Sequence, residues 1–372
     1  MKQLYFDYAS TTPVDPKVFE VMTPYFLEDF GNPSSDTHSF GWKAKAAVNK
    51  ARKNIATHIN AEEDELIFTS GATESMNIAI KGVFDRFTKV GKHIITSKTE
   101  HSCSLDTIKY LEQYHDAEVT YISTDKNGLI NISDLEKAIR TDTVLINFMW
   151  VNNETGIIQN VEKIGEIALT HNIQFTCDAT QALGKLNIDV KQCKASLLAI
   201  SSHKIYGPKG IGALYMSRKN PRANLTKTMH GGEQEKNIRP GTINTPGAVG
   251  FSAAVQLLGK TEEKQLLKLL NRKLVQFFTS LSFDVVGDKS ARCDHIINVV
   301  AKKIDAVKLL KLNPNIAFSL GSACTSSNTK PSHVLLGMNY SLNQTKNSFR
   351  ISLGRFTSEQ DVDYLISNFK WK

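Results

Sequence analysis

The sequence predicts an α/β fold in which helices cover both faces of a mostly parallel sheet. Seven strand-like apolar runs occur between residues 65 and 216, and helical patterns lie between most of them. Strands and helices that alternate in this way are typical of parallel sheets. The chain has 372 residues, 41% of them hydrophobic, so it is long enough for a large core and a second domain.

The strand-like runs are short and rich in β-branched and other apolar residues. They are ELIFT (65–69), HIITS (93–97), EVTYI (118–122), VLINFM (144–149), IQFTC (173–177), SLLAIS (196–201) and GALYM (212–216). A helical stripe with a spacing of three or four residues consists of Ala47, Val48, Ala51, Ile55 and Ile59. After about residue 250 a long helix-prone stretch and shorter elements follow, which indicates a second domain.

Composition argues against several classes of protein. The net charge is +8, but the 45 Lys and Arg residues are spread along the chain, which favours a solvated surface over direct nucleic-acid binding. No stretch approaches the roughly 18 apolar residues of a membrane span, and the opening residues lack a signal-peptide core, so we expect a cytoplasmic protein without membrane contact.

The cysteines are odd in number, widely spaced and never arranged as CxxC, which argues against a disulfide framework or a zinc site. They are Cys103, Cys177, Cys193, Cys293 and Cys324.

Polar motifs follow four of the predicted strands, where parallel sheets bind ligands. They are TSGATES (69–75), SKTEHSC (97–103), CDATQALGK (177–185) and SSHKIYGPKG (201–210). Gly71, Ala72 and Thr73 begin a helix, whose amides and a side-chain donor suit a phosphate, with Ser201 and His203 as further donors. The alternative for such a hydroxyl is an ordinary N-cap.

Asp178 and Lys204 end neighbouring strands and suggest a specific chemistry. A poorly hydrated Asp178 requires a cation, such as a protonated pyridine nitrogen, unless it caps a turn or pairs with an arginine. A desolvated Lys204 has a lowered proton affinity, so its neutral amine can form a Schiff base with an aldehyde cofactor; the alternative is a lysine that snorkels to solvent. The two are placed to hold one pyridine from two adjacent edges.

Ten motifs, in order along nearly the whole chain, resemble a cysteine desulfurase of the class V aminotransferase family of pyridoxal-phosphate-dependent enzymes. They are YFDYASTTPVDP, FGNPSS, FTSGATES, TSKTEH, VNNETG, CDATQALGK, SHKIYGPKGIGALY, RPGTIN, GSACTS and FRISLGRFT. The resemblance implies the aspartate aminotransferase fold (type I), with a mostly parallel seven-stranded sheet flanked by helices and a smaller α+β domain. We expect a large domain at 15–255 and a small domain at 1–14 and 256–372.

The resemblance also assigns roles around pyridoxal 5′-phosphate. It makes Lys204 the Schiff-base lysine and Asp178 the partner of the ring nitrogen. Gln181 hydrogen-bonds the phenolic oxygen, Asn152 contacts cofactor or substrate, and His101 stacks on the ring and exchanges protons. From the residues alone, His101 reads as the start of a helix.

The phosphate ligands implied by the resemblance come from two subunits. Ala72, Thr73, Ser201 and His203 bind it from the same chain, whereas Thr242 reaches across from the other subunit. The resemblance therefore implies an obligate homodimer.

Substrate and sulfur transfer involve three further residues. Arg350 is the expected ligand of the carboxylate of L-cysteine, because a guanidinium binds it through two parallel hydrogen bonds, and Asn32 assists. Arg355 is the alternative ligand, although a structural ion pair suits it better. Cys324, in the small-residue run GSACTSSN, is the implied catalytic nucleophile that accepts the sulfur.

Alternatives remain for the activity. The expected product is a persulfide for a sulfur-acceptor protein, either an iron-sulfur scaffold or a tRNA thiolase. The rivals are an aminotransferase or a selenocysteine lyase on the same cofactor, and a non-catalytic scaffold of a sulfur-transfer complex. Cys324 argues against transamination, which requires no thiol.

Overall fold

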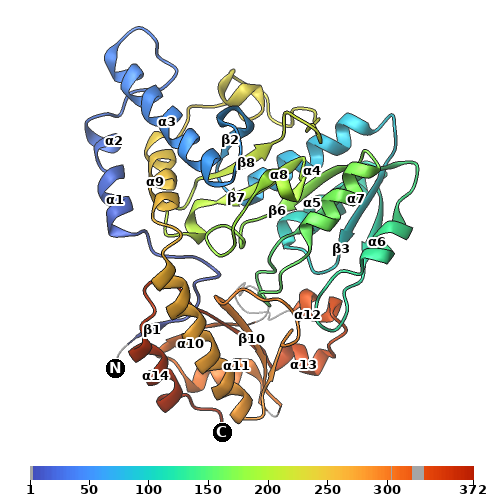
Figure 1. Cartoon of the computed structure of the whole chain (residues 1–372), viewed down its shortest axis with the longest axis vertical. Helices are drawn as coiled ribbons and strands as arrows, with labels where there is room; N and C mark the ends of the chain where they lie inside the picture. Colours follow the sequence, from blue (N-terminus) through green and yellow to red (C-terminus); the bar gives the residue numbers. More distant parts are fainter. Residues whose placement is uncertain (1–2, 303, 321–330) are drawn as a thin grey trace.

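The structure is a computed structural model that describes residues 3–302, 304–320 and 331–372. Figure 1 shows a larger body that holds the main sheet and a smaller body that contains both chain ends.

The central sheet has seven strands within the described residues, in the order β2-β8-β7-β6-β5-β3-β4. Its strands are β2 (Leu66–Thr69), β3 (His93–Ser97), β4 (Glu118–Ile122), β5 (Thr143–Met149), β6 (Gln174–Asp178), β7 (Leu197–Ser201) and β8 (Gly212–Met216). Strand β8 runs antiparallel to β2 and β7, and the other neighbours pair parallel. The seven predicted runs are therefore confirmed, each to within one residue at either end.

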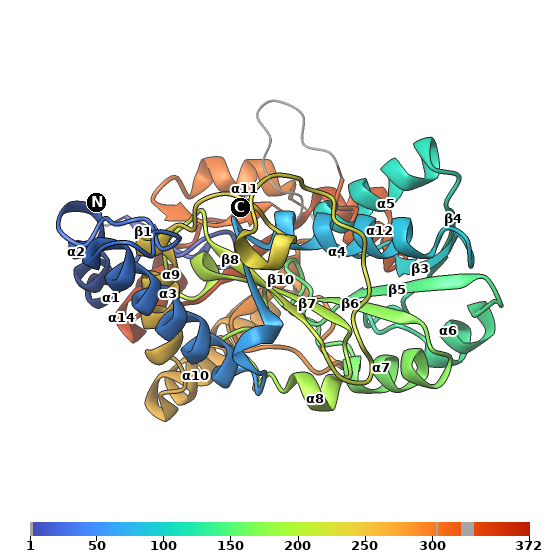
Figure 2. The ribbon, with the colours of Figure 1, turned by 90° about the horizontal axis from the view of Figure 1, so that it is seen from above.

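Helices cover both faces of this sheet. The helices of the larger body are α1 (Pro16–Met22), α2 (Pro24–Leu27), α3 (Ser39–His58), α4 (Ala72–Phe87), α5 (Ser102–Tyr114), α6 (Ile132–Ala138), α7 (Val161–Thr170), α8 (Val190–Cys193) and α9 (Thr245–Gln256). Figure 2 shows α4 and α5 on one face, with α7 and α8 on the other. Successive strand residues point to opposite faces, so Ile94 and Leu145 join one core cluster while Ile95 and Ile146 join the other. The apolar stripe predicted on α3 is confirmed for Val48, Ala51, Ile55 and Ile59, which pack into one of these cores, whereas Ala47 is half-buried outside it.

The smaller body is an α+β arrangement around an antiparallel sheet in the order β12-β13-β10-β9. Its strands are β9 (Asp284–Val285), β10 (Ile296–Val300), β12 (Ser319–Leu320) and β13 (Ser348–Ser352). Its helices are α10 (Thr261–Ser280), α11 (Ala306–Leu312), α12 (His333–Gly337), α13 (Leu342–Lys346) and α14 (Glu359–Asn368). Near the N-terminus, β1 (Leu4–Tyr5) pairs parallel with β11 (Ile316–Ala317).

Three 3-10 turns complete the described elements. They are η1 (Glu63–Glu65), η2 (Ser202–Lys204) and η3 (Gln234–Asn237). In the described part of the chain, no helix combines the length and the apolar character that a membrane crossing requires.

The smaller body has its own core, which N-terminal residues help to build. Leu4 and Phe6 pack into one cluster with apolar residues from Leu267 to Phe369. This separate cluster supports the predicted division into 15–255 and 1–14 with 256–372, although the boundaries themselves stay a prediction.

Phe349 lies at the centre of this second core and is fully buried. Its ring centroid is 5.4 Å from that of Phe278 and 5.3 Å from that of Phe318. We expect Phe349→Ala to lower the free energy of unfolding by about 3–5 kcal/mol, because it removes buried apolar area and leaves a cavity. Urea unfolding followed by tryptophan fluorescence measures this loss.

The matched control is Tyr114→Ala, since that side chain is 71% exposed. Its expected effect is within about 0.5 kcal/mol. Equal effects of the two substitutions would contradict the assignment of Phe349 to a packed core.

Candidate active site

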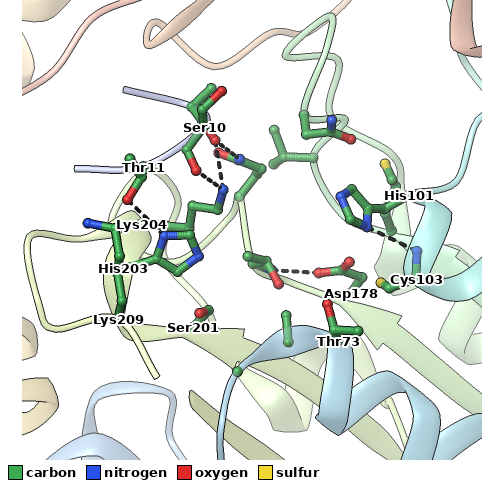
Figure 3. A pocket seen from close by; sticks show the side chains of 18 of the residues that line it. Ser10, Thr11, Thr73, His101, Cys103, Asp178, Ser201, His203, Lys204 and Lys209 are labelled. Atoms are coloured by element: carbon green, nitrogen blue, oxygen red, sulfur yellow. Dashed lines mark hydrogen bonds between the residues drawn. The ribbon is translucent and has the colours of Figure 1, made fainter. Parts of the chain in front are cut away.

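A cavity of about 550 Å³ opens where the carboxyl ends of β6 and β7 meet the smaller body. Figure 3 shows side chains from several elements pointing into it. Its walls include the turn at 9–11, the start of α4, the segments after β6 and β7, and Arg350 from β13. The predicted sheet edge therefore carries the site, and both bodies contribute to it.

Lys204 ends η2, directly after β7, and lines the cavity. Its Nζ donates to Ala9 O at 2.9 Å and to Ser10 O at 2.6 Å, so the amine is held inside the site instead of snorkelling to solvent. Burial, with help from the positive charges of Lys185 and Arg350, lowers the pKa of Lys204 to about 7. A substantial fraction of this amine is therefore neutral near pH 7.

Asp178 ends β6 and is 6% exposed. Its Oδ1 accepts the backbone N–H of Thr180 at 2.9 Å, so the turn-capping interpretation is correct for one oxygen. Among the residues that the structure describes, no arginine or lysine forms an ion pair with it. Figure 3 places the carboxylate between Thr73 and His101, where it faces the cavity. A cationic group bound there would have Asp178 as its counter-ion.

His101 has two functions that the sequence presented as alternatives. It is the N-cap of α5, and its Nδ1 accepts the backbone N–H of Cys103 at 3.2 Å. Its ring also lines the cavity (Figure 3), and burial lowers its pKa. The neutral ring therefore presents a flat, largely apolar face to whatever the cavity holds.

The first turn of α4 offers free amides at one end of the cavity. Its N-cap, Gly71, has no side-chain cap, and Ala72 and Thr73 line the site. Gly71 has φ +153°, and a Cβ there would lie 3.8 Å from Ser201 Oγ. The helix N-terminus and the Ser201 hydroxyl thus converge on one spot suited to an anion.

His203 lies near Ser201 in the same cavity (Figure 3). Its Nδ1 lies 3.1 Å from Thr11 Oγ1. Burial and the charges of Lys204 and Lys209 lower the pKa of His203 to about 4, so the ring is neutral and one nitrogen donates while the other accepts.

Arg350 is carried into the cavity by β13 and is 6% exposed. Its Nη2 donates to Asp7 Oδ1 at 2.7 Å and Ser10 Oγ at 2.6 Å, and its Nη1 donates to Asn153 O at 2.8 Å. Its Nε is buried and has no hydrogen-bond partner among the described residues. The guanidinium is therefore held in a fixed orientation at the cavity wall.

Arg355 does not line the cavity but forms the structural ion pairs that were predicted as its more suitable role. Its Nη1 contacts Asp15 Oδ2 at 2.9 Å, and its Nε contacts Glu263 Oε2 at 3.0 Å. Its guanidinium also lies 4.5 Å from the ring centroid of Tyr206.

Several predicted site residues lie elsewhere. Asn152 is behind the cavity wall, where its Nδ2 donates to Thr99 O at 2.9 Å and its Oδ1 accepts from Glu154 N and Thr155 N. Because these bonds occupy its amide, Asn152 supports the wall, and the neighbouring Asn153 lines the cavity instead.

Asn32 and Thr242 are exposed and do not line the cavity of this chain. Asn32 Oδ1 accepts Ser34 N at 2.9 Å, as in an ordinary turn. Cys324 lies outside the described residues. Gln181, by contrast, is buried at the cavity, and its Nε2 donates to Ala9 O at 2.8 Å.

The sequence reasoning missed other residues of the wall. Ser10, Thr11, Asn153, Glu154 and Lys209 all line it. Glu154 is 4% exposed, its Oε2 accepts from Ser332 Oγ at 2.5 Å, and burial raises its pKa. The motifs YASTT, VNNETG and GPKG contain these residues, so a signal was present in the same stretches that were already singled out.

The model of the aminotransferase class-V family matches residues 4–365. The chain belongs to this family. Among curated relatives of this family member, "Cysteine desulfurase IscS" of Vibrio vulnificus is 46% identical, with 99% of this chain and 92% of the relative covered. The protein of the same name from Neisseria meningitidis is 45% identical over the same shares.

Solved structures agree with this family assignment. A "NIFS-like protein" superposes with a TM-score of 0.92 at 32% identity and covers 99% of this chain and 98% of its own. "SspA in complex with cysteine" superposes with a TM-score of 0.85 at 38% identity, with 95% and 100% covered. The class V fold predicted from the motifs is thereby confirmed.

The lowered pKa of Lys204 leads to a measurable reactivity. In the protein without bound ligand, acetylation of Lys204 by acetic anhydride, followed by peptide mass spectrometry, is expected to titrate with a midpoint of about 7. Below this pH the amine is protonated and unreactive, whereas above it the neutral amine reacts. The amines of ordinary exposed lysines have a pKa of about 10.4, so their acetylation titrates at much higher pH.

Arg350→Met provides a further check, because it removes one of the positive charges that lower this pKa. The midpoint of Lys204 then moves to higher pH. A wild-type midpoint near that of exposed lysines would show that the amine is not desolvated.

Proposed function

We propose that this class V family member is a pyridoxal-phosphate-dependent cysteine desulfurase that converts L-cysteine to L-alanine and transfers the sulfur to Cys324 as a persulfide. The observation that carries the proposal is the shared cavity of Lys204 and Asp178, at adjacent strand ends beside the first turn of α4. The printed names of the curated relatives support the same activity.

The side chains of the cavity fit pyridoxal 5′-phosphate at three points. The uncapped amides of α4, with Thr73, Ser201 and His203, match a phosphate dianion. The carboxylate of Asp178 matches a protonated pyridine nitrogen, and the amine of Lys204 matches the aldehyde. When bound, the cofactor supplies an electron sink for the negative charge that develops on the substrate Cα.

The protein residues around that group have separable tasks. With the cofactor bound, Asp178 would keep the proton on the ring nitrogen, and His101 would cover one ring face. Gln181 would donate to the phenolic oxygen. Lys204, with its pKa near 7, is suited to remove the proton from the substrate Cα and to return it later.

Arg350 binds the carboxylate of L-cysteine from the wall formed by β13. Its Nη2 is held by Asp7 and Ser10, so it is already oriented before substrate binds. A neighbouring structure described as a complex with cysteine supports an amino-acid substrate of this size. Asn32 lies outside the cavity of its own chain, so its contact with the substrate stays a prediction from the FGNPSS motif.

The thiolate of Cys324 accepts the sulfur atom from the substrate. The thiolate forms the new S–S bond while the substrate Cβ–S bond breaks, and the electron pair of that bond stays with the carbon skeleton that becomes alanine. The persulfide then passes to an acceptor protein, for which an iron-sulfur scaffold and a tRNA thiolase are the two proposals.

Two substitutions test the activity. Cys324→Ala keeps the visible absorbance of the bound cofactor and still binds cysteine, but its release of sulfide with a thiol reductant falls by more than about 100-fold, since the nucleophile is lost. Lys204→Ala forms no borohydride-reducible bond to the cofactor. Both are compared with wild type by spectroscopy and by assays of alanine and sulfide.

Each rival predicts a different result in this experiment. Normal sulfide release from Cys324→Ala would refute the nucleophile, and a keto acid instead of alanine would indicate an aminotransferase. Faster turnover of selenocysteine than of cysteine would indicate a selenocysteine lyase. If wild-type protein takes up no pyridoxal phosphate, the non-catalytic scaffold of a sulfur-transfer complex is the alternative that remains.

The homodimer is also a proposal, supported by exposed apolar side chains on α1, on α2, in the segment that follows α2 and at the start of α3. Figure 1 shows where these helices lie in the larger body. The exposed side chains of this apolar surface are Phe19, Phe26, Leu27, Phe30, Phe40 and Trp42. Phe26 is 57% and Leu27 73% exposed, and such a cluster is unusual on a monomer surface. A second copy that covers it would allow Thr242, which is outside its own cavity, to complete the phosphate site of its partner.

The double substitution Phe26→Glu with Leu27→Glu places two charges in this surface. We expect it to yield monomers in sedimentation velocity and to weaken pyridoxal phosphate binding about tenfold or more, because the ligand from the partner is lost. Val90→Glu, at a side chain that is 68% exposed outside this surface, is the control. A double variant that remains dimeric would disprove this interface.

A further inference from the structure

Lys185 is a second lysine close to the reactive amine, and so far only the effect of its charge on the pKa of Lys204 has been described. It lies at the end of CDATQALGK, in the turn that follows β6. Its Nζ donates to Gln181 Oε1 at 3.0 Å. Within the described part of the chain, no carboxylate forms an ion pair with it.

The side-chain amide of Gln181 is held at both of its polar atoms. Its Oε1 accepts from Lys185, and its Nε2 donates to Ala9 O at 2.8 Å. A lysine can only donate and a backbone carbonyl can only accept, so these two partners permit one orientation of the amide. Ala9 O is also the acceptor of Lys204 Nζ at 2.9 Å, so a continuous hydrogen-bonded chain joins Lys185 to Lys204.

We propose that Lys185 is a positioning residue that acts through Gln181, holding its amide so that the N–H side and not the carbonyl serves the cofactor. The inference rests on the proposed function, because it concerns the phenolic oxygen of the pyridoxal ring. Nε2 carries two hydrogens, of which Ala9 O takes one. The second remains for the phenolic oxygen. Without Lys185, the amide can turn over and present an acceptor to an oxygen that requires a donor.

The backbone is built for this contact. Gly184 has φ +76°, and a Cβ there would lie 2.8 Å from Leu258 Cδ2 and 2.9 Å from Ile205 Cγ2. Lys185 N donates to Ala182 O at 3.0 Å in the same tight turn. Only glycine fits this turn without displacement of those neighbours, and the turn brings Lys185 back over Gln181.

The surroundings keep Lys185 as a cation near neutral pH without an acidic partner. Burial lowers its pKa only to about 8. The titratable and charged groups around it are Tyr8, Lys204, Tyr206, Glu263, Cys293 and His295. Glu263 is engaged by Arg355, and burial, with the charge of Lys185, lowers the pKa of His295 to about 3, so that ring is neutral. Lys185 therefore donates to the Gln181 carbonyl as a cation, and its charge also lowers the pKa of Lys204.

The test uses the holoenzyme and a double-mutant cycle of Lys185→Met with Gln181→Leu. We expect Lys185→Met to raise the dissociation constant for pyridoxal phosphate about tenfold, the value of one hydrogen bond to a charged group. We also expect the pH titration of the visible cofactor band to move to higher pH by about one unit, since the ionised oxygen loses its donor. Lys185→Arg keeps charge and donors and returns both values close to wild type.

The cycle separates positioning from charge alone. When Gln181→Leu is already present, adding Lys185→Met changes the dissociation constant by less than about twofold if Lys185 acts through Gln181. Fully additive effects, or an unchanged cofactor band in Lys185→Met, would overturn the inference. Failure of the proposed cofactor is distinguishable, because wild type itself would then show no cofactor band. Failure of the proposed activity on that cofactor would appear in the alanine and sulfide assays and would leave the band in place. Circular dichroism confirms that each variant is folded.

Discussion

The structure of the site depends on the burial of one lysine amine, that of Lys204, in a poorly hydrated cavity, where the charged form of the amine is destabilised. Lys204 has two backbone carbonyls as partners and two cationic residues as neighbours, and it has no carboxylate in an ion pair among the residues that the structure describes. Burial and the two neighbouring cations disfavour the ammonium form despite the two carbonyl acceptors, and a nucleophilic amine must be neutral. The same carbonyl of Ala9 also receives the amide of Gln181, so the turn at 9–11 sets the position of two functional side chains at once.

The cavity exists only because distant parts of the chain meet. Arg350 of the smaller body is joined to Asp7, near the N-terminus, at 2.7 Å, and both are largely buried. Arg355 links the same body to Asp15. Buried ion pairs of this kind contribute little net stability, but they tolerate few other geometries. They hold the wall that carries the proposed carboxylate ligand against the strand ends that carry the proposed cofactor ligands.

Much of the fold was predictable, because local patterns carry it. Seven apolar runs became the seven strands, and the stripe on α3 became its buried face, since both depend on side-chain periodicity. The placement of Lys204, Asp178 and His101 around one cavity was also predictable, because each ends a strand or begins a helix at the same sheet edge. Asn152 and Asn153 show the limit of prediction from the motif. They are adjacent in VNNETG, but the local turn places only Asn153 on the cavity wall.

The sequence by itself determined the order of strands and helices, the motifs at the strand ends and the family, because these follow from residue type and spacing. Only the tertiary structure decided which lysine, carboxylate and guanidinium share a cavity with the turn at 9–11. It also decided that Lys185 donates a hydrogen bond to Gln181. Burial and hydrogen-bond partners are properties of residues brought together from far apart in the chain, and they set the pKa of Lys204 and the orientation of each donor.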